Sequence, residues 1–103
     1  MTKIELERAL EERCVARVEA LGGMAIKLLV PGVRGFPDRG CFLPGRPLLP
    51  RQTFFLEFKR LKTGRVSAQQ HMWCFKLTEL GFGVYMIDTD AQFEDALARE
   101  MSR

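Results

Sequence analysis

The sequence predicts an α/β domain with the element order α-β-β-β-α-β-α, in which helices flank a mixed four-stranded sheet. One observation is that three segments with helical periodicity, each opened by a Ser or Thr cap, alternate with four short apolar runs. The other is the spacing of those runs, because short Gly- and Pro-containing links join the first three and a helix joins the third to the fourth. Short links permit antiparallel neighbours, whereas a helical link indicates a parallel pair.

Capping residues and glycines delimit the three predicted helices. Each helix begins with the pattern S/T-x-x-E/Q, in which the first side chain caps the helix and the fourth bonds back to it. The capping residues are Thr2, Ser67 and Thr89, and glycine ends the first two helices at Gly22 and Gly81. The side chains expected to face the core from the second helix are Ala68, Met72, Phe75 and Leu80, with Leu77 at their flank.

The apolar runs predict strands over residues 24–30, 38–43, 53–59 and 82–87. Side chains alternate between the faces of a strand, so Phe54, Leu56 and Phe58 share one apolar face of the third strand. Its other face ends in two opposite charges, Glu57 and Lys59, which a strand interior normally excludes. This face is therefore expected to carry the function.

Composition places the chain among ordinary globular proteins. With 103 residues, 47% of them hydrophobic and 28% charged, residues 1–103 are expected to form a single domain. The formal charge of +3 permits a polyanionic partner without requiring one. The three cysteines lack C-x-x-C spacing, which indicates that their thiols stay reduced and pack inside an intracellular protein. No apolar run approaches the roughly 18 to 20 residues of a membrane span, and no signal segment opens the chain, so we expect a cytoplasmic protein with no membrane partner.

Asp38 and Glu57 are the candidate metal ligands. Hydrolysis of a phosphodiester needs an activated water and neutralisation of the charge that builds on phosphate, and a hard divalent cation bound by oxygen ligands supplies both. Adjacent antiparallel strands can bring these two carboxylates to one ion. Lys59, on the same face as Glu57, would orient the attacking water or pair with the phosphate in the transition state.

The residues that carry this chemistry resemble a known family. Pro37-Asp38 followed by Glu57-Phe58-Lys59 resembles the PD-(D/E)xK signature of restriction-enzyme-like nucleases. Nearly the whole chain is similar to the virus-type replication-repair nuclease (VRR-NUC) domain, through Gly22-Gly23, Lys27, Gly35-Phe36-Pro37-Asp38-Arg39, Glu57-Phe58-Lys59, Ser67-Ala68-Gln69-Gln70 and Leu80-Gly81.

The resemblance implies a restriction-endonuclease-like core and a Mg²⁺-dependent endodeoxyribonuclease in which Mn²⁺ substitutes. Branched DNA such as a Holliday junction is the substrate class it implies, in a phage-encoded or bacterial intracellular protein, and a helicase partner stays open. By the resemblance Asp38, Glu57 and the backbone carbonyl of Phe58 would hold the metal, and Lys59 would be the catalytic lysine. Gln70 would face the site from its helix, although helix capping alone also explains that residue.

The nuclease pattern also places a catalytic glutamate on the first helix, where Glu11 and Glu12 are adjacent. Glu11 lies on the apolar stripe of the helix and Glu12 on the wetter side, so Glu11 is the expected site residue. A glutamate on such a stripe needs a charged partner, which would be the metal cluster or Lys27. The alternative is that Glu11 only pairs with a surface arginine.

Basic residues beside the predicted site are expected to contact DNA phosphates, although loop cations also occur simply as solvated groups. They are Lys27, Arg34, Arg39, Lys62 and Arg65. A homodimer is predicted, because symmetric cutting of two strands needs two sites held at a fixed separation. Leu48, Leu49 and Phe82 are candidate contacts for that dimer. The sequence leaves two other functions open, a non-catalytic DNA-binding module and an accessory subunit of a replication or repair complex.

Overall fold

The computed structural model describes residues 2–45, 52–58 and 66–102. Within these ranges the chain forms three helices, α1 (Lys3–Ala20), α2 (Ala68–Glu79) and α3 (Asp90–Met101). It also forms four strands, β1 (Met24–Lys27), β2 (Arg39–Leu43), β3 (Gln52–Phe58) and β4 (Gly83–Ile87). Their order along the chain, α1-β1-β2-β3-α2-β4-α3, confirms the predicted fold class.

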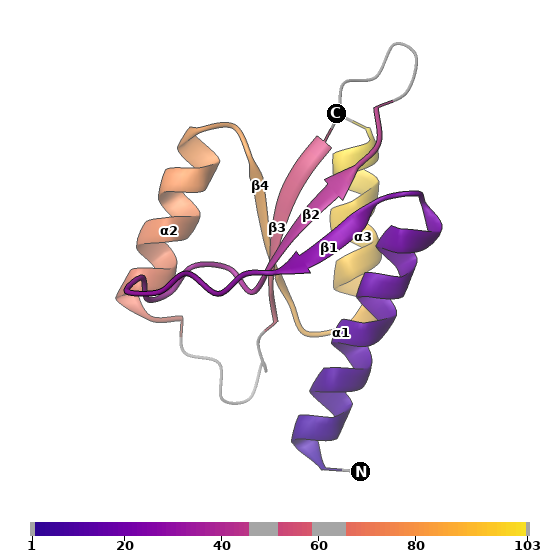
Figure 1. The fold of residues 1–103 in the computed structure, drawn as a ribbon, viewed down its shortest axis with the longest axis horizontal. Coiled ribbons are helices and arrows are strands. Elements are labelled where there is room, and N and C mark those ends of the chain that lie inside the picture. The colour runs from indigo at the N-terminus through magenta and orange to yellow at the C-terminus, as the bar shows by residue number, and fades with distance from the viewer. Residues whose placement is uncertain (1, 46–51, 59–65, 103) are drawn as a thin grey trace.

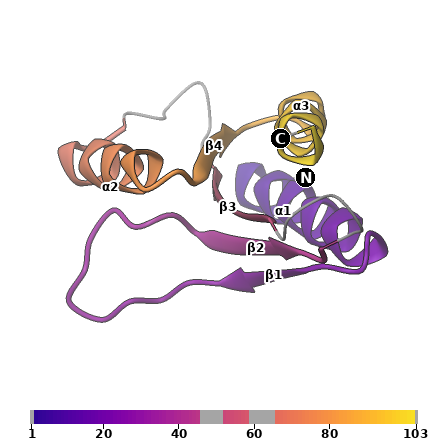
Figure 2. The same cartoon turned by 90° about the horizontal axis from the view of Figure 1, so that it is seen from above.

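The strands form one mixed sheet with the spatial order β1-β2-β3-β4. β1 with β2 and β2 with β3 are antiparallel, whereas β3 and β4, joined through α2, are parallel. α2 covers one face of the sheet, and α1 and α3 cover the other (Figures 1 and 2). The central strand β3 is therefore covered on both faces. Phe54 and Leu56 belong to the main core, whereas Phe55 contacts Phe36.

The predicted helix starts are confirmed. Thr2 accepts a hydrogen bond from the backbone N–H of Glu5, at 3.1 Å. Complete capping boxes open the other two helices, formed by Ser67 with Gln70 and by Thr89 with Gln92. Because a capping side chain satisfies an otherwise unpaired N–H of the first turn, its loss costs about 0.5 to 2 kcal/mol.

β1 is shorter than the predicted run over 24–30. Its pairing with β2 ends at Lys27, which lies opposite Arg39. One further contact follows, in which the N–H of Leu28 donates to the carbonyl of Asp38 at 2.8 Å. Pro37 has no N–H to extend the ladder, so the chain leaves the sheet here and forms the loop over 28–38.

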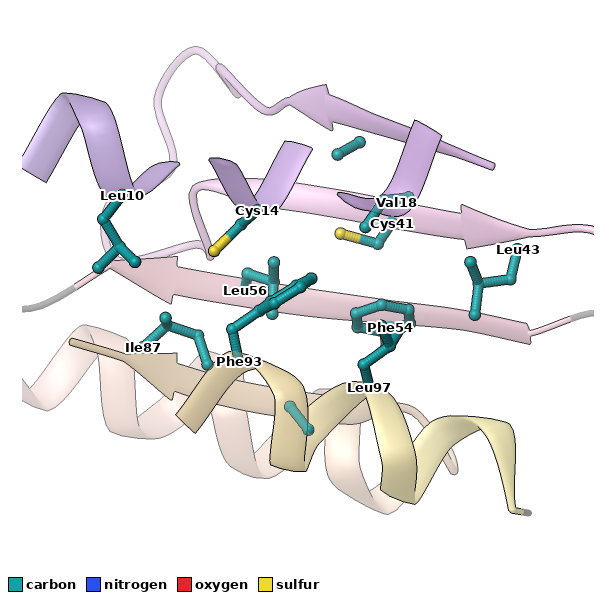
Figure 3. Close-up of a cluster of buried hydrophobic side chains, with 12 residues drawn as sticks. Leu10, Cys14, Val18, Cys41, Leu43, Phe54, Leu56, Ile87, Phe93 and Leu97 are labelled. Atoms are coloured by element: carbon teal, nitrogen blue, oxygen red, sulfur yellow. The ribbon is translucent and has the colours of Figure 1, made fainter. Parts of the chain in front are cut away.

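The main core lies between the sheet and the helix pair α1 and α3 (Figure 3). Its buried side chains are Leu10, Cys14, Val18, Ala25, Cys41, Leu43, Phe54, Leu56, Ile87, Phe93, Ala96 and Leu97. All three cysteines are free, as predicted. Burial raises the pKa of Cys14 and of Cys41 to about 12, so both thiols are neutral at physiological pH.

The predicted inward face of α2 was wrong. Leu77, placed at the flank, is the buried residue of this helix, whereas Phe75 is 65% exposed and Leu80 is 73% exposed. The reason is tertiary, because the Trp73 ring packs edge-on against Phe36 at 5.2 Å between ring centroids. This contact turns the other apolar stripe of α2 toward solvent.

In the described part of the chain, no helix has the length and apolar character to cross a membrane.

Candidate active site

Asp38 and Glu57 come together where β2 begins and β3 ends. The antiparallel register pairs Arg39 with Leu56, so the next positions outward are Asp38 and Glu57. The Oδ2 atom of Asp38 accepts a hydrogen bond from the backbone N–H of Phe58, at 3.0 Å. This bond ties the Asp38 carboxylate to the backbone of β3 immediately beside Glu57.

Glu57 is only 7% exposed and contacts α2 directly. Its Oε1 atom accepts a hydrogen bond from Nε2 of Gln70, at 3.0 Å. The Oε1 atom of Gln70 in turn accepts from the backbone N–H of Ser67, at 2.9 Å. Since the amide oxygen serves the helix cap, the amide nitrogen is the end that faces Glu57. Gln70 therefore combines the two roles that the sequence left open, helix capping and contact with the candidate site.

The donor atoms at this position suit a hard cation. Mg²⁺ binds carboxylate oxygens and retains several waters, so one or two carboxylates suffice for it. Among the residues described by the structure, no group of three or more His, Cys, Asp or Glu side chains is placed to hold a metal ion. A cation at this site would therefore be held by Asp38 and Glu57 with backbone, water and substrate oxygens. The ligand set expected from the sequence, Asp38, Glu57 and the carbonyl of Phe58, stays a prediction.

The first-helix glutamate has a partner that the sequence did not single out. Glu11 is less exposed than Glu12, as the apolar stripe of the helix predicted. Its Oε2 atom lies 2.7 Å from Nε of Arg39, and Arg39 also donates from Nη1 to the carbonyl of Ala25 at 3.2 Å. The arginine alternative is the contact that forms, although the arginine is half-buried and not on the open surface.

Glu11 and Glu57 contact opposite faces of the sheet. Arg39 directs its guanidinium to the α1 face, where it meets Glu11. Gln70 reaches Glu57 from α2, which covers the other face. The adjacent residues Asp38 and Arg39 thus serve different faces, the first turned to the end of β3 and the second to α1.

The predicted DNA contacts are placed only in part. Lys27 is exposed at the end of β1, and Arg34 is exposed in the loop over 28–38. Arg39 is half-buried and paired with Glu11. Three of the predicted site residues, Lys59, Lys62 and Arg65, lie outside the described residues, as do the dimer candidates Leu48 and Leu49.

Phe82, the third dimer candidate, is half-buried and packs edge-on against Phe55, with 5.6 Å between ring centroids.

Two contacts of the site were not predicted from the sequence. They join the N–H of Phe58 to Asp38 and the guanidinium of Arg39 to Glu11. The expected antiparallel pairing of the second and third strands is the signal that could have found the first of them, because the observed register, with Arg39 opposite Leu56, brings Asp38 to the end of β3. No local pattern points to the second, which joins residues 28 positions apart.

Comparison with solved structures shows which fold this chain resembles. A solved structure described as a VRR_NUC domain superposes with a TM-score of 0.76, covering 89% of this chain and 94% of that chain at 24% sequence identity. No protein-family model and no curated protein matches the sequence. The chain therefore adopts the fold of a VRR_NUC domain, which the motif resemblance predicted.

Proposed function

We propose that the protein is a metal-dependent DNA endonuclease that hydrolyses phosphodiester bonds. The observation that carries the proposal is the junction of Asp38 and Glu57 at the end of the β2 and β3 pair, held by Phe58 N–H and by Gln70. Two carboxylates at one sheet end suit a cation that binds phosphate, and the VRR_NUC fold supports the same chemistry.

In this proposal Asp38, Glu57 and the backbone carbonyl of Phe58 hold Mg²⁺, with Mn²⁺ as a substitute. When bound, the cation supplies an activated water and neutralises charge on the phosphate. Asp38 and Glu57 are each held by a hydrogen bond from β3 or α2, so little reorganisation of the carboxylates accompanies the reaction. Lys59, which the motif assigns, orients the attacking water or pairs with the phosphate.

DNA binding rests in this proposal on cations around the site. Lys27 and Arg34 are exposed on β1 and on the adjacent loop, where they can reach phosphates. Lys62 and Arg65 complete the set by sequence, and Arg39 contributes mainly by holding Glu11. Because each neutralised phosphate releases counterions, binding should weaken steeply as the salt concentration rises.

Branched DNA, such as a Holliday junction, is the proposed substrate class, and a homodimer is the proposed assembly. One site makes one nick, so paired incisions in a junction need two sites related by a two-fold axis. Sedimentation at micromolar concentration with junction DNA should show a dimer. A protein that stays monomeric with DNA present would remove this part of the proposal.

The decisive experiment compares a labelled four-way junction with a linear duplex of matched sequence, in Mg²⁺, Mn²⁺, Ca²⁺ or EDTA. Cleavage that requires Mg²⁺ or Mn²⁺ and favours the junction supports the proposal. Binding of DNA without cleavage under every condition would identify the non-catalytic binding module. If the protein neither binds nor cleaves DNA, the result would favour an accessory subunit of a larger complex.

A further inference from the structure

Gly35 lies in the loop between β1 and β2, where its backbone meets the first turn of α2. Its φ of +84° falls in the left-handed region that favours glycine. A Cβ atom at this position would lie 2.6 Å from the carbonyl carbon of Gln69 and 2.6 Å from the amide nitrogen of Gln70. Both are backbone atoms, so no side chain can swing aside to relieve the contact. Glycine alone permits this approach.

The helix residue touched by Gly35 is the one that holds Glu57. Gln70 donates from Nε2 to Oε1 of Glu57 at 3.0 Å, and its backbone N–H donates to Oγ of Ser67 at 3.1 Å. The contact of the loop thus falls on the capped first turn of α2. Displacement of this turn would move the Gln70 amide relative to the sheet.

The loop is held in place by the residue that follows Gly35. The ring of Phe36 packs edge-on against Phe55 of β3 and Trp73 of α2, with centroid distances of 5.9 Å and 5.2 Å. The loop over 28–38 extends from the sheet to the N-terminal end of α2 (Figures 1 and 2). Since Phe36 fixes the loop to both elements, an added Cβ at residue 35 has little room to be absorbed by the loop.

We propose that Gly35 is a positioning residue. It allows the loop over 28–38 to approach the first turn of α2 closely, and this approach sets the position from which Gln70 contacts Glu57. Gly35 contacts none of the reacting groups and acts through Gln70. A methyl group at this position moves the first turn of α2 and lengthens the contact between Gln70 and Glu57. The effect on cleavage rests on the proposed function, whereas the effect on the contact does not.

Gly32 provides a matched control for Gly35. It lies in the same loop with a φ of +77°, and a Cβ atom there would have nothing within 4 Å. Gly35→Ala and Gly32→Ala therefore carry similar left-handed strain, but only Gly35→Ala clashes with α2. Gly35→Ala should lower kcat at least about tenfold, as small displacements of positioned groups do, with little change in KM, while Gly32→Ala keeps wild-type kcat.

A double-mutant cycle tests the route through Gln70. In the Gln70→Ala background, Gly35→Ala should cause no further loss of kcat, because residues that act through one contact are non-additive. Full additivity of the two changes would overturn the proposed route. Equal kcat values for Gly35→Ala and Gly32→Ala would overturn the positioning role itself.

A readout without DNA or metal separates this inference from the proposed function. The side-chain amide NMR signals of Gln70, assigned by their loss in Gln70→Ala, should shift in Gly35→Ala and stay unchanged in Gly32→Ala. Unchanged signals in both variants would overturn the inference, even if the wild type cuts DNA. If Gly35→Ala fails to fold, the wild type provides the test. Its NMR spectrum must show a cross-peak between Gly35 Hα and the backbone amide proton of Gln70, and absence of this cross-peak overturns the inference.

If the wild type cuts no DNA in Mg²⁺ or Mn²⁺, the proposed function fails, and the NMR comparison still decides whether Gly35 positions Gln70. If the wild type cuts DNA and both alanine variants cut equally well, only the role of Gly35 fails.

Discussion

The Oε2 atom of Glu11 lies 2.7 Å from Nε of Arg39, an ion pair that joins α1 to β2. Both side chains are about one-fifth exposed, at 19% for Glu11 and 20% for Arg39. Arg39 also donates to the carbonyl of Ala25, so one guanidinium connects α1, β1 and β2. Loss of the arginine would leave a half-buried carboxylate without its charged partner.

We predict that Arg39→Met lowers the free energy of unfolding by about 1 to 3 kcal/mol, the usual cost of leaving a buried polar group unsatisfied. Arg17→Met is the control, because Arg17 pairs with Glu94 at 3.4 Å and both side chains are about half exposed, at 45% and 52%. Exposed pairs contribute about 0 to 1 kcal/mol. Urea unfolding monitored by circular dichroism measures both, and equal losses would contradict the structural role of Arg39.

The catalytic role expected of Glu11 can be tested separately from its pair with Arg39. If Glu11 serves the site, Glu11→Gln should lower cleavage at least about tenfold, or about 1.4 kcal/mol in the barrier, while Glu12→Gln changes it little. If Glu11 only pairs with Arg39, Glu11→Gln should lower stability and leave cleavage intact. Cleavage rates measured beside unfolding curves for the two variants distinguish these cases.

Removal of either candidate ligand should separate cleavage from binding. Asp38→Asn and Glu57→Gln are each expected to abolish cleavage while DNA binding stays intact or becomes tighter, because each removes negative charge that faces phosphate. Asp95→Asn, at an exposed position of α3, removes the same charge away from the site and should leave cleavage unchanged. Gel shifts in Ca²⁺ and cleavage assays in Mg²⁺ provide the measurements. Wild-type cleavage by Asp38→Asn would show that the site is misassigned.

Gln70 and Gln92 allow a matched comparison of two variants, which separates the effect of helix capping on cleavage from the effect of the contact with Glu57. Both complete a capping box, and the structure shows Gln70 also bonded to Glu57. Gln70→Ala and Gln92→Ala should each lose about 0.5 to 1.5 kcal/mol of stability for the bond to the N-cap N–H, and Gln70→Ala should lose more because buried Glu57 also loses a donor. Cleavage should fall only for Gln70→Ala. An equal fall in both variants would indicate that capping, and not the contact with Glu57, explains the loss.

The buried thiols predict a loss of stability at alkaline pH. Burial raises the pKa of Cys14 and of Cys41 from 9.0 to about 12. As the pH rises above 9 the unfolded chain releases these protons before the folded chain does, so the free energy of unfolding should fall between pH 9 and pH 12. In the folded protein a thiol reagent should modify the half-buried Cys74 first, and equal rates for all three cysteines would contradict the assigned burial.

The local parts of this fold were predictable because short-range interactions determine them. A capping box joins residues three positions apart, so the starts of α2 and α3 could be assigned from Ser67 and Thr89 alone. The alternation of side chains along β3 likewise separated Phe54 and Leu56 from Glu57, because it depends only on the backbone geometry of a strand. The motif around Asp38 and Glu57 then predicted the fold that the structure confirms.

Contacts between distant segments decided the rest. Helical periodicity could not choose between the two apolar stripes of α2, and the Phe36 ring decided the choice by packing on Trp73 from a loop 37 positions away. The charged partner of Glu11 was likewise decided by the β1 and β2 register, which brings Arg39 under α1. The sequence by itself therefore determined the elements, their caps and the candidate ligands, because those depend on neighbours along the chain. Only the tertiary structure decided which face α2 buries, how closely Gly35 approaches α2 and how Gln70 contacts Glu57, because those depend on packing between segments far apart in sequence.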